Sequence, residues 1–208
     1  NLPPARLYEE AVRRGEAHPS ADGALICHTG EFTGRSPNDK FVVEEPETSA
    51  DIWWGKVNKP ISGAAFDQLL NKVRHHLGGR DLFAFDGYAG ADPRYRMPVR
   101  VITETAWQAL FSSNMFVRET DREKLAHFQP GFVVLDAMTF RADPAVDGTR
   151  SSTFILVNFA ENMVLIGGTE YAGEIKKSIF TVMNHVLPGK GIFPMHCSAN
   201  YGAERDDV

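Results

Sequence analysis

The sequence predicts an α/β domain in which helices flank a mixed β-sheet. Strand-like apolar runs outnumber helical patterns, and a hairpin-type pair of runs occurs beside strand–helix–strand units. Parallel and antiparallel neighbours should therefore share one sheet. The most informative unit is residues 163–200, where an apolar run ends in Gly167-Gly168, a helical pattern follows, and a second apolar run carries His196 and Cys197. We expect strand, glycine turn, helix, turn and strand in that order.

The other elements follow from periodicity and from the residues that begin and end them. Ser62 is a suitable N-cap for a helix over residues 63–77, whose apolar residues recur at helical spacing. Residues 152–159 and 163–166 are two strands joined as a hairpin. Residues 51–59 predict an irregular strand, and residues 24–27 a short buried one. Further helices are predicted at 5–16, 104–115 and 121–128, and further strands at 40–44, 81–88, 99–103 and 132–135.

The helix after Gly168 presents one apolar stripe with two adjacent lysines outside it. At about 100° per residue, Lys176 falls at the edge of the stripe and Lys177 nearly opposite. Spacing alone favours a solvated Lys177 and a Lys176 that extends along the edge of the core. His196 in an apolar strand is, by the same reasoning, more often a buried, hydrogen-bonded histidine than a ligand. The stripe consists of Ala172, Ile175, Ile179, Val182, Met183 and Val186.

Composition narrows the functional class. The 208 residues are 43% hydrophobic and 24% charged, and the net charge of −5 gives no reason to expect a nucleic-acid partner. No run approaches the roughly 18 apolar residues of a membrane span, and the first 20 residues do not resemble a signal peptide. Cys27 and Cys197 are far apart, so we expect reduced thiols in a cytoplasmic protein without a membrane partner. Because the chain starts at Asn1 and stops at Val208 without a turn or cap, we expect both ends to be internal to a longer polypeptide.

A glycine-containing loop at residues 28–40 is the second informative stretch. Gly30 and Gly34 allow close backbone approach, and Arg35 offers a planar group suited to a carboxylate or phosphate. The loop lacks the spacing and the Lys-[Ser/Thr] ending of a nucleotide phosphate loop. The alternative is a surface turn in which Arg35 pairs with Asp39, and the residues alone do not decide between the two.

Several catalytic signatures are missing, which limits what the residues imply unaided. The chain has no GxSxG, HExxH or GxGxxG motif, and Glu174 stands where a phosphate loop after Gly168 would need lysine. The remaining candidates are Arg35, Lys176, Lys177 and His196. Such a cluster would suit a polyanionic substrate together with a metal.

Three separated motifs resemble those of the ATP-dependent phosphoenolpyruvate carboxykinases. TGEFTGRSPNDK at residues 29–40 is similar to the family's TGxxTGRSPxDK, and GGTEYAGEIKK at 167–177 to its GGTxYxGExKK. The stretch from Leu187-Pro188 to MHCSAN at 195–200 resembles LPxxGxxxMHCSAN, and residues 101–116 also fit the family pattern. The resemblance runs from about residue 5 to the end and favours the ATP-using branch over the GTP-using one.

The resemblance implies a reaction and roles for individual residues. The family converts oxaloacetate and ATP to phosphoenolpyruvate, CO2 and ADP, a gluconeogenic lyase reaction, with Mn2+ and Mg2+ as cofactors. Arg35 matches the arginine that binds the substrate carboxylate, and Tyr171 a tyrosine beside the substrate. Lys177 matches a lysine that ligates Mn2+ as a neutral amine and contacts substrate, and His196 the second protein ligand. Arg35, Lys176 and Lys177 are then the catalytic residues, and Lys177 and His196 also face the nucleotide.

The chemistry is compatible with these roles. A lysine ligates only when deprotonated, and from a reference pKa of about 10.4 this needs desolvation and nearby cations such as Lys176 and the metal. Decarboxylation leaves an enolate, which cations stabilise before in-line phosphoryl transfer.

The motifs also indicate which part of the family's fold is present. The family's GxxGxGKT phosphate loop, its metal-binding aspartate and a further substrate arginine do not occur in residues 1–208. We therefore expect the N-terminal, substrate-side domain of the carboxykinase fold, inactive by itself, with the nucleotide-binding domain outside this sequence and a monomer as the favoured state. The alternative from another class is a non-catalytic, carboxylate-binding or regulatory module.

Overall fold

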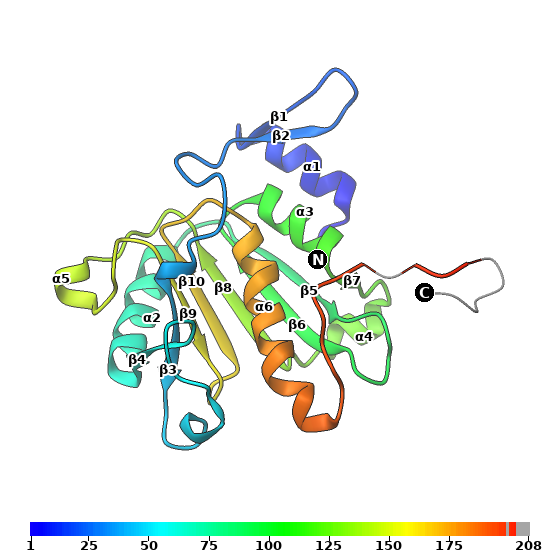
Figure 1. Ribbon diagram of the computed structural model, residues 1–208. Coiled ribbons are helices and arrows are strands. Elements are labelled where there is room, and N and C mark those ends of the chain that lie inside the picture. Colours follow the sequence, from blue (N-terminus) through cyan, green and yellow to red (C-terminus); the bar gives the residue numbers. More distant parts are fainter. Residues whose placement is uncertain (199, 203–208) are drawn as a thin grey trace.

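The computed structural model, which describes residues 1–198 and 200–202, has an eight-stranded mixed sheet at its centre (Figure 1). The strand order is β4-β3-β9-β10-β8-β6-β5-β7, and a separate two-stranded hairpin pairs β1 with β2. The predicted α/β class with a mixed sheet is confirmed. The strands are β1 (Ala17–Pro19), β2 (Leu25–Cys27), β3 (Lys40–Glu44), β4 (Lys59–Ser62), β5 (Phe83–Ala89), β6 (Met97–Thr103), β7 (Val117–Arg118), β8 (Phe132–Ala137), β9 (Phe154–Asn158) and β10 (Met163–Gly167).

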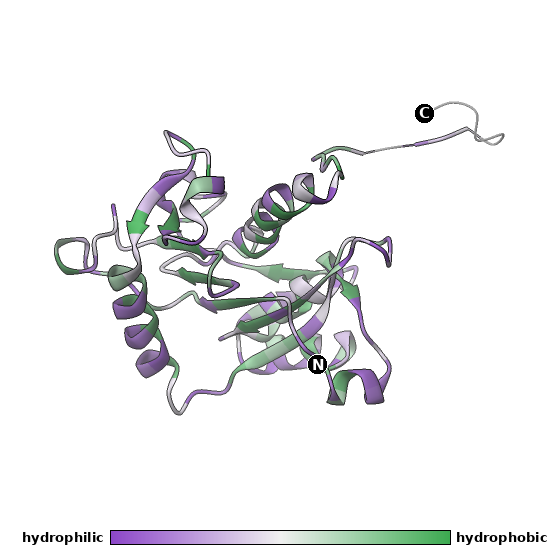
Figure 2. Ribbon diagram, turned by 90° about the horizontal axis from the view of Figure 1, so that it is seen from below, coloured by the Kyte–Doolittle hydropathy of each residue, from purple (hydrophilic) through white to green (hydrophobic). Residues whose placement is uncertain are grey.

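Helices cover both faces of this sheet. The helices are α1 (Pro4–Arg13), α2 (Gly63–Leu77), α3 (Ala106–Met115), α4 (Arg122–Ala126), α5 (Pro144–Asp147) and α6 (Gly173–Val186). Because neighbouring residues of a strand point to opposite faces, Leu165 packs with α2 while Val164 and Ile166 pack with α6. Figure 2 shows the hydrophobic colour concentrated in the central strands, whereas the helices carry both colours.

A third apolar cluster joins the N-terminal helix to the region where α6 begins. Leu7 and Ala11 of α1 pack with Ala106 and Trp107 of α3, and Ala172 belongs to the same cluster. In Figure 1 the blue α1 lies beyond α3 at one end of the sheet. This packing fixes the start of α6 against the sheet and against α3.

Most predicted elements are confirmed, and the helix at residues 63–77 has the predicted bounds. The Ser62 side chain accepts a hydrogen bond from the backbone N–H of Ala65 at 3.2 Å, as expected of an N-cap. The hairpin is confirmed as well, since β9 and β10 pair antiparallel.

Three predictions about strands are wrong. Residues 51–59 form no strand, because the chain bends there and pairs only from Lys59 onward, where β4 lies parallel to β3. Residues 24–27 alternate between exposed and half-buried rather than being buried, since β2 pairs only with β1 outside the main sheet. Residues 192–198 are not a strand: Phe193 is 82% exposed and Pro194 lacks a backbone N–H, so this apolar run has no sheet edge to join.

No helix among the described residues is both long enough and apolar enough to cross a bilayer.

Candidate functional site

The candidate site lies where three parallel neighbours, β6, β8 and β10, reach their carboxyl ends. Ligands of α/β proteins commonly bind beyond such ends. Here β10 runs through Gly167-Gly168 into α6. Gly168 has φ +69°, and a Cβ at this position would lie 2.4 Å from the carbonyl oxygen of Ser152. Only glycine fits this turn, so the chain reverses tightly and places the start of α6 over the sheet edge.

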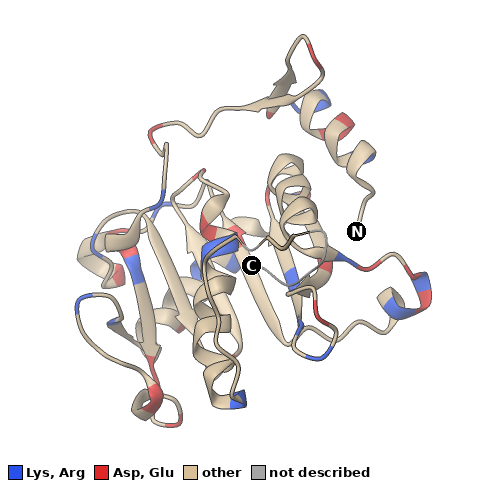
Figure 3. Cartoon of the chain, turned by 45° about the vertical axis from the view of Figure 1, so that its right-hand side comes forward, with Lys and Arg blue, Asp and Glu red and all other residues tan. Residues whose placement is uncertain are grey.

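The loop carrying Arg35 is attached to the first turn of α6 by Glu174. This carboxylate is 1% exposed, accepts a 2.6 Å hydrogen bond from the backbone N–H of Ser36, and lies 3.6 Å from Nε of Arg35. Arg35 keeps 36% of its side chain exposed, so its guanidinium remains accessible. In Figure 3, acidic and basic residues both appear at the N-terminal end of α6.

The alternative pairing of Arg35 with Asp39 is wrong. Asp39 is buried, and its carboxylate accepts two 2.9 Å hydrogen bonds from Arg150 and one from the Ser151 hydroxyl. The charge partner of Asp39 is therefore Arg150 and not Arg35. Arg35 instead lies near Glu174 and lines the pocket described next.

Arg35, Tyr171, Lys176 and Lys177 line one pocket of about 270 Å3. Its apolar wall comes from Trp107 and other residues of α3. Four of the five sequence-predicted residues thus meet in a single cavity with three cations. A cavity of this size and charge suits a small polyanion.

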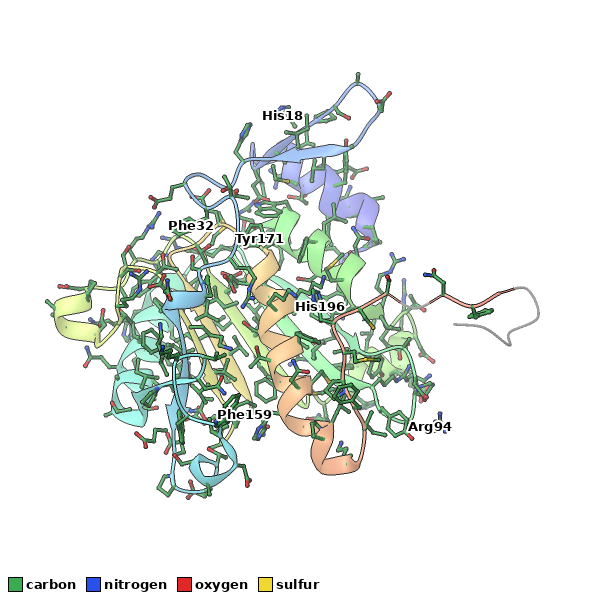
Figure 4. All side chains as sticks on the ribbon, viewed as in Figure 1. His18, Phe32, Arg94, Phe159, Tyr171 and His196 are labelled. Carbon is green, nitrogen blue, oxygen red and sulfur yellow. The ribbon has the colours of Figure 1, made fainter. Side chains whose placement is uncertain are left out.

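The two lysines are exposed in the reverse of the predicted order. Lys176 is exposed and Lys177 is half-buried. The reason is tertiary, because the segment after α6 returns along that helix and places His196 against Lys177. Figure 4 shows Tyr171 at the start of α6 and His196 beside the same helix.

The side-chain nitrogens of Lys177 and His196 lie close together in the site. Nζ of Lys177 lies 2.8 Å from Nε2 and 3.4 Å from Nδ1 of His196. Desolvation, and then the positive charges of Lys176 and Arg35, lower the pKa of Lys177. The lysine therefore lies in surroundings that favour its neutral form, the form that donates a lone pair.

This pair fits part of a divalent metal's ligand set. Two neighbouring ligands of an octahedral ion at about 2.1 Å lie about 3 Å apart, close to the observed separation of the two nitrogens. Within residues 1–198 and 200–202, no three His, Cys, Asp or Glu residues converge on one point. The described residues thus offer an amine and an imidazole, and further ligands would have to come from substrate, water or other residues.

Two buried carboxylates were missed by sequence reasoning. From the sequence, Glu174 only excludes a phosphate loop, although an acidic residue in the first turn of a helix is itself a signal of a role there. Asp136, at the end of β8, is 1% exposed, and its Oδ1 has no hydrogen-bond partner among the described residues. Burial, and then the charges of Glu104 and Glu174, raise the pKa of Asp136 well above its ordinary value.

The fold and the pocket define an α/β domain that gathers three cationic side chains in one cavity, beside a close amine–imidazole pair. The family model described as phosphoenolpyruvate carboxykinase, in its ATP-dependent form, matches residues 1–208. The chain belongs to this family. Ala199 of the MHCSAN motif lies outside the described residues.

Individual relatives agree with the family match. The chain is 56% identical over 206 residues to the phosphoenolpyruvate carboxykinase (ATP) of Geobacter sp. strain M21. The aligned region covers 99% of this chain and 39% of the relative. It is 53% identical over 206 residues to enzyme 1 of that name from Moorella thermoacetica, again covering 99% and 39%. For the Geobacillus kaustophilus protein of that name the identity is 53% over 203 residues, covering 97% and 38%. The chain thus spans about two fifths of the length of these relatives.

Proposed function

We propose that residues 1–208 are the substrate- and metal-binding, N-terminal part of an ATP-dependent phosphoenolpyruvate carboxykinase. The reaction is the decarboxylation and phosphorylation of oxaloacetate by ATP, which gives phosphoenolpyruvate, CO2 and ADP in the gluconeogenic direction. The observation that carries this proposal is the 2.8 Å approach of Lys177 and His196 beside the pocket of Arg35 and Tyr171. Family membership and the names of the relatives support this reaction.

Each residue has a separate task in this proposal. Arg35 binds a substrate carboxylate, and Tyr171 borders the substrate in the same pocket. Lys176 and Lys177 supply positive potential where the enolate develops after loss of CO2. Lys177 as a neutral amine and His196 as a neutral imidazole would hold Mn2+ near the nucleotide phosphates, with Mg2+ accompanying ATP. When bound, the divalent ions would neutralise charge on the enolate and on the transferred phosphoryl group.

The nucleotide-binding half of the reaction is assigned to sequence outside this chain. Residues 1–208 contain no GxxGxGKT loop, and the relatives are more than twice as long as the matched region. The 208 residues alone would then lack a cradle for the triphosphate and be inactive. We further propose a cytoplasmic protein, in keeping with the free thiols of Cys27 and Cys197, and a monomer as its simplest state.

Arg35→Ala tests the carboxylate role. In the full-length protein, KM for oxaloacetate and for phosphoenolpyruvate should rise at least about tenfold, the effect of losing a charge-assisted hydrogen bond. KM for nucleotide should change by less than about twofold. Arg94→Ala removes an exposed arginine paired with Asp92 and serves as the control, with no change in either constant. Equal effects of Arg35→Ala on substrate and nucleotide would contradict the assignment.

Metal binding tests the second half of the site. Lys177→Ala and His196→Gln should each weaken Mn2+ binding by at least about tenfold in an electron paramagnetic resonance titration of the full-length protein, because each removes one donor atom. The exposed His127, at the end of α4, provides a matched control through His127→Gln. Unchanged Mn2+ affinity in both site variants would exclude ligation by this pair.

A further inference from the structure

A groove beside the Tyr171 pocket, which shares Arg35 and Lys177 with it, runs between α6 and residues 51–58. It consists of two adjoining hollows of about 320 and 300 Å3. Lys40, Val57, Thr181 and Asn184 line both hollows, which makes the groove continuous. Tyr171 and α3 line neither of them.

Lys40 is the unusual residue of this groove. It is only 9% exposed, and within the described part of the chain its ammonium group has no hydrogen bond or ion pair. Lys59, on the neighbouring strand β4, by contrast donates to the carbonyl of Asn38 at 2.9 Å. A mostly buried ammonium group is poorly solvated, so an anion entering the groove would be stabilised at Lys40.

Two carboxylates close to Lys40, those of Asp39 and Glu174, are already engaged elsewhere. Asp39 is held by Arg150, and Glu174 accepts from Ser36 and faces Arg35. Desolvation, and then the charge of Arg35, lower the pKa of Lys40, while Glu174 opposes the shift. A ligand anion would supply what these side chains do not, and would restore the charged form of the lysine.

The two hollows differ in chemistry. The first adds the cations Arg35, Lys56 and Lys177 to Lys40 and has no acidic residue in its lining. The second adds an aromatic wall from Trp53, which is 88% exposed, and from Phe159, whose ring lies 4.1 Å from that of His185. Asp51 is the acidic residue of the second hollow and lines it alongside Trp53. A ligand that fits both ends has an anionic head and a flat, apolar body.

We propose that this groove binds a small organic anion of that kind, an aryl or heteroaryl carboxylate or phosphate, with its head at Lys40 and its ring against Trp53 and Phe159. The proposal does not rest on the carboxykinase reaction, since it predicts binding rather than turnover. Carboxylate and phosphate heads share the chemistry that Lys40 recognises, and the probes below distinguish them.

The test is isothermal titration calorimetry on the full-length protein. The probes are benzoate and phenyl phosphate, with neutral benzamide and ring-free acetate as comparisons. We expect benzoate or phenyl phosphate to bind at least about tenfold more tightly than benzamide, the loss expected of a missing charge-assisted hydrogen bond. The tighter of the two anions identifies the head group.

The variants locate the site. Lys40→Met keeps side-chain bulk without charge and should weaken anion binding at least about tenfold, whereas Lys40→Arg should retain it. Trp53→Ala, at a position where the side chain is 88% exposed, should weaken benzoate binding several-fold and leave acetate binding unchanged. Lys124→Met, on the distant α4, should change nothing.

Three results would overturn the proposal. One is an absence of measurable binding of either anion by the wild type. Another is equal affinity for benzoate and benzamide. The third is binding that Tyr171→Ala abolishes while Lys40→Met or Trp53→Ala leaves it intact, because the anion would then sit in the substrate pocket.

Discussion

Glu174→Ala should raise KM for oxaloacetate at least about tenfold while leaving KM for ATP within about twofold, although Glu174 itself is too deeply buried to touch either. Its carboxylate connects the Arg35 loop to α6 through the Ser36 N–H and the Arg35 guanidinium. Without it, Ser36 loses its acceptor and Arg35 loses the charge that orients it. The free energy of unfolding should fall by about 2 kcal/mol, a modest value because Arg35 is partly exposed and can turn to water.

A conservative variant separates positioning from stability. Glu174→Gln keeps an oxygen that accepts from Ser36 and should retain most of the stability, but its neutral amide no longer attracts Arg35, so KM for oxaloacetate should stay high. Asp147→Ala is the matched control, because Asp147 is also a buried carboxylate that pairs with a basic residue, Lys72, away from the site. It should lower stability without altering KM. A Glu174→Gln enzyme with wild-type KM would show that Glu174 only supports the fold.

Local patterns predicted the parts of the fold that local physics determines. The bounds of α2 follow from the Ser62 cap and an apolar stripe, and the stripe of α6 packs as its spacing predicts. The prediction of a strand for the segment carrying His196 is wrong because strand formation depends on more than local sequence. Apolar composition favours a strand, but a strand also requires a partner edge, and partner edges are a property of the whole sheet.

The candidate site depends more heavily on long-range contacts. Spacing placed Lys177 opposite the core of α6, and nothing local predicts that His196, nineteen residues later, covers it. The roles of Arg35, Tyr171, Lys177 and His196 came from the family motifs and not from periodicity. The partnership of Glu174 with the Arg35 loop spans 138 residues in sequence, so only the folded structure reveals it.

Asp136→Asn should stabilise the protein at pH 8 relative to the wild type, with an advantage that shrinks as the pH falls toward 4. Burial, then the charges of Glu104 and Glu174, raise the pKa of Asp136 in the folded state. In the unfolded chain its pKa returns to about 3.9. Above that pH the folded protein binds the proton more tightly than the unfolded chain does, so the stability that Asp136 contributes is complete below about pH 4 and is lost as the pH rises. Asparagine does not ionise, so the Asp136→Asn variant should keep its stability as the pH rises.

Asp147→Asn supplies a control with the opposite sign. Burial works to raise the pKa of Asp147, but hydrogen bonds from Lys72, the backbone of Asp143 and Gln68 outweigh it, and the net pKa is lowered. The contribution of Asp147 to stability is therefore present above its ordinary pKa and lost as the pH falls. Asp147→Asn should accordingly lower the free energy of unfolding most at pH 8. Urea unfolding of wild type and both variants between pH 4 and 8 measures the two trends. Parallel pH profiles for wild type and Asp136→Asn would mean that Asp136 is ionised in the folded protein, with its unpaired Oδ1 carrying charge into the core.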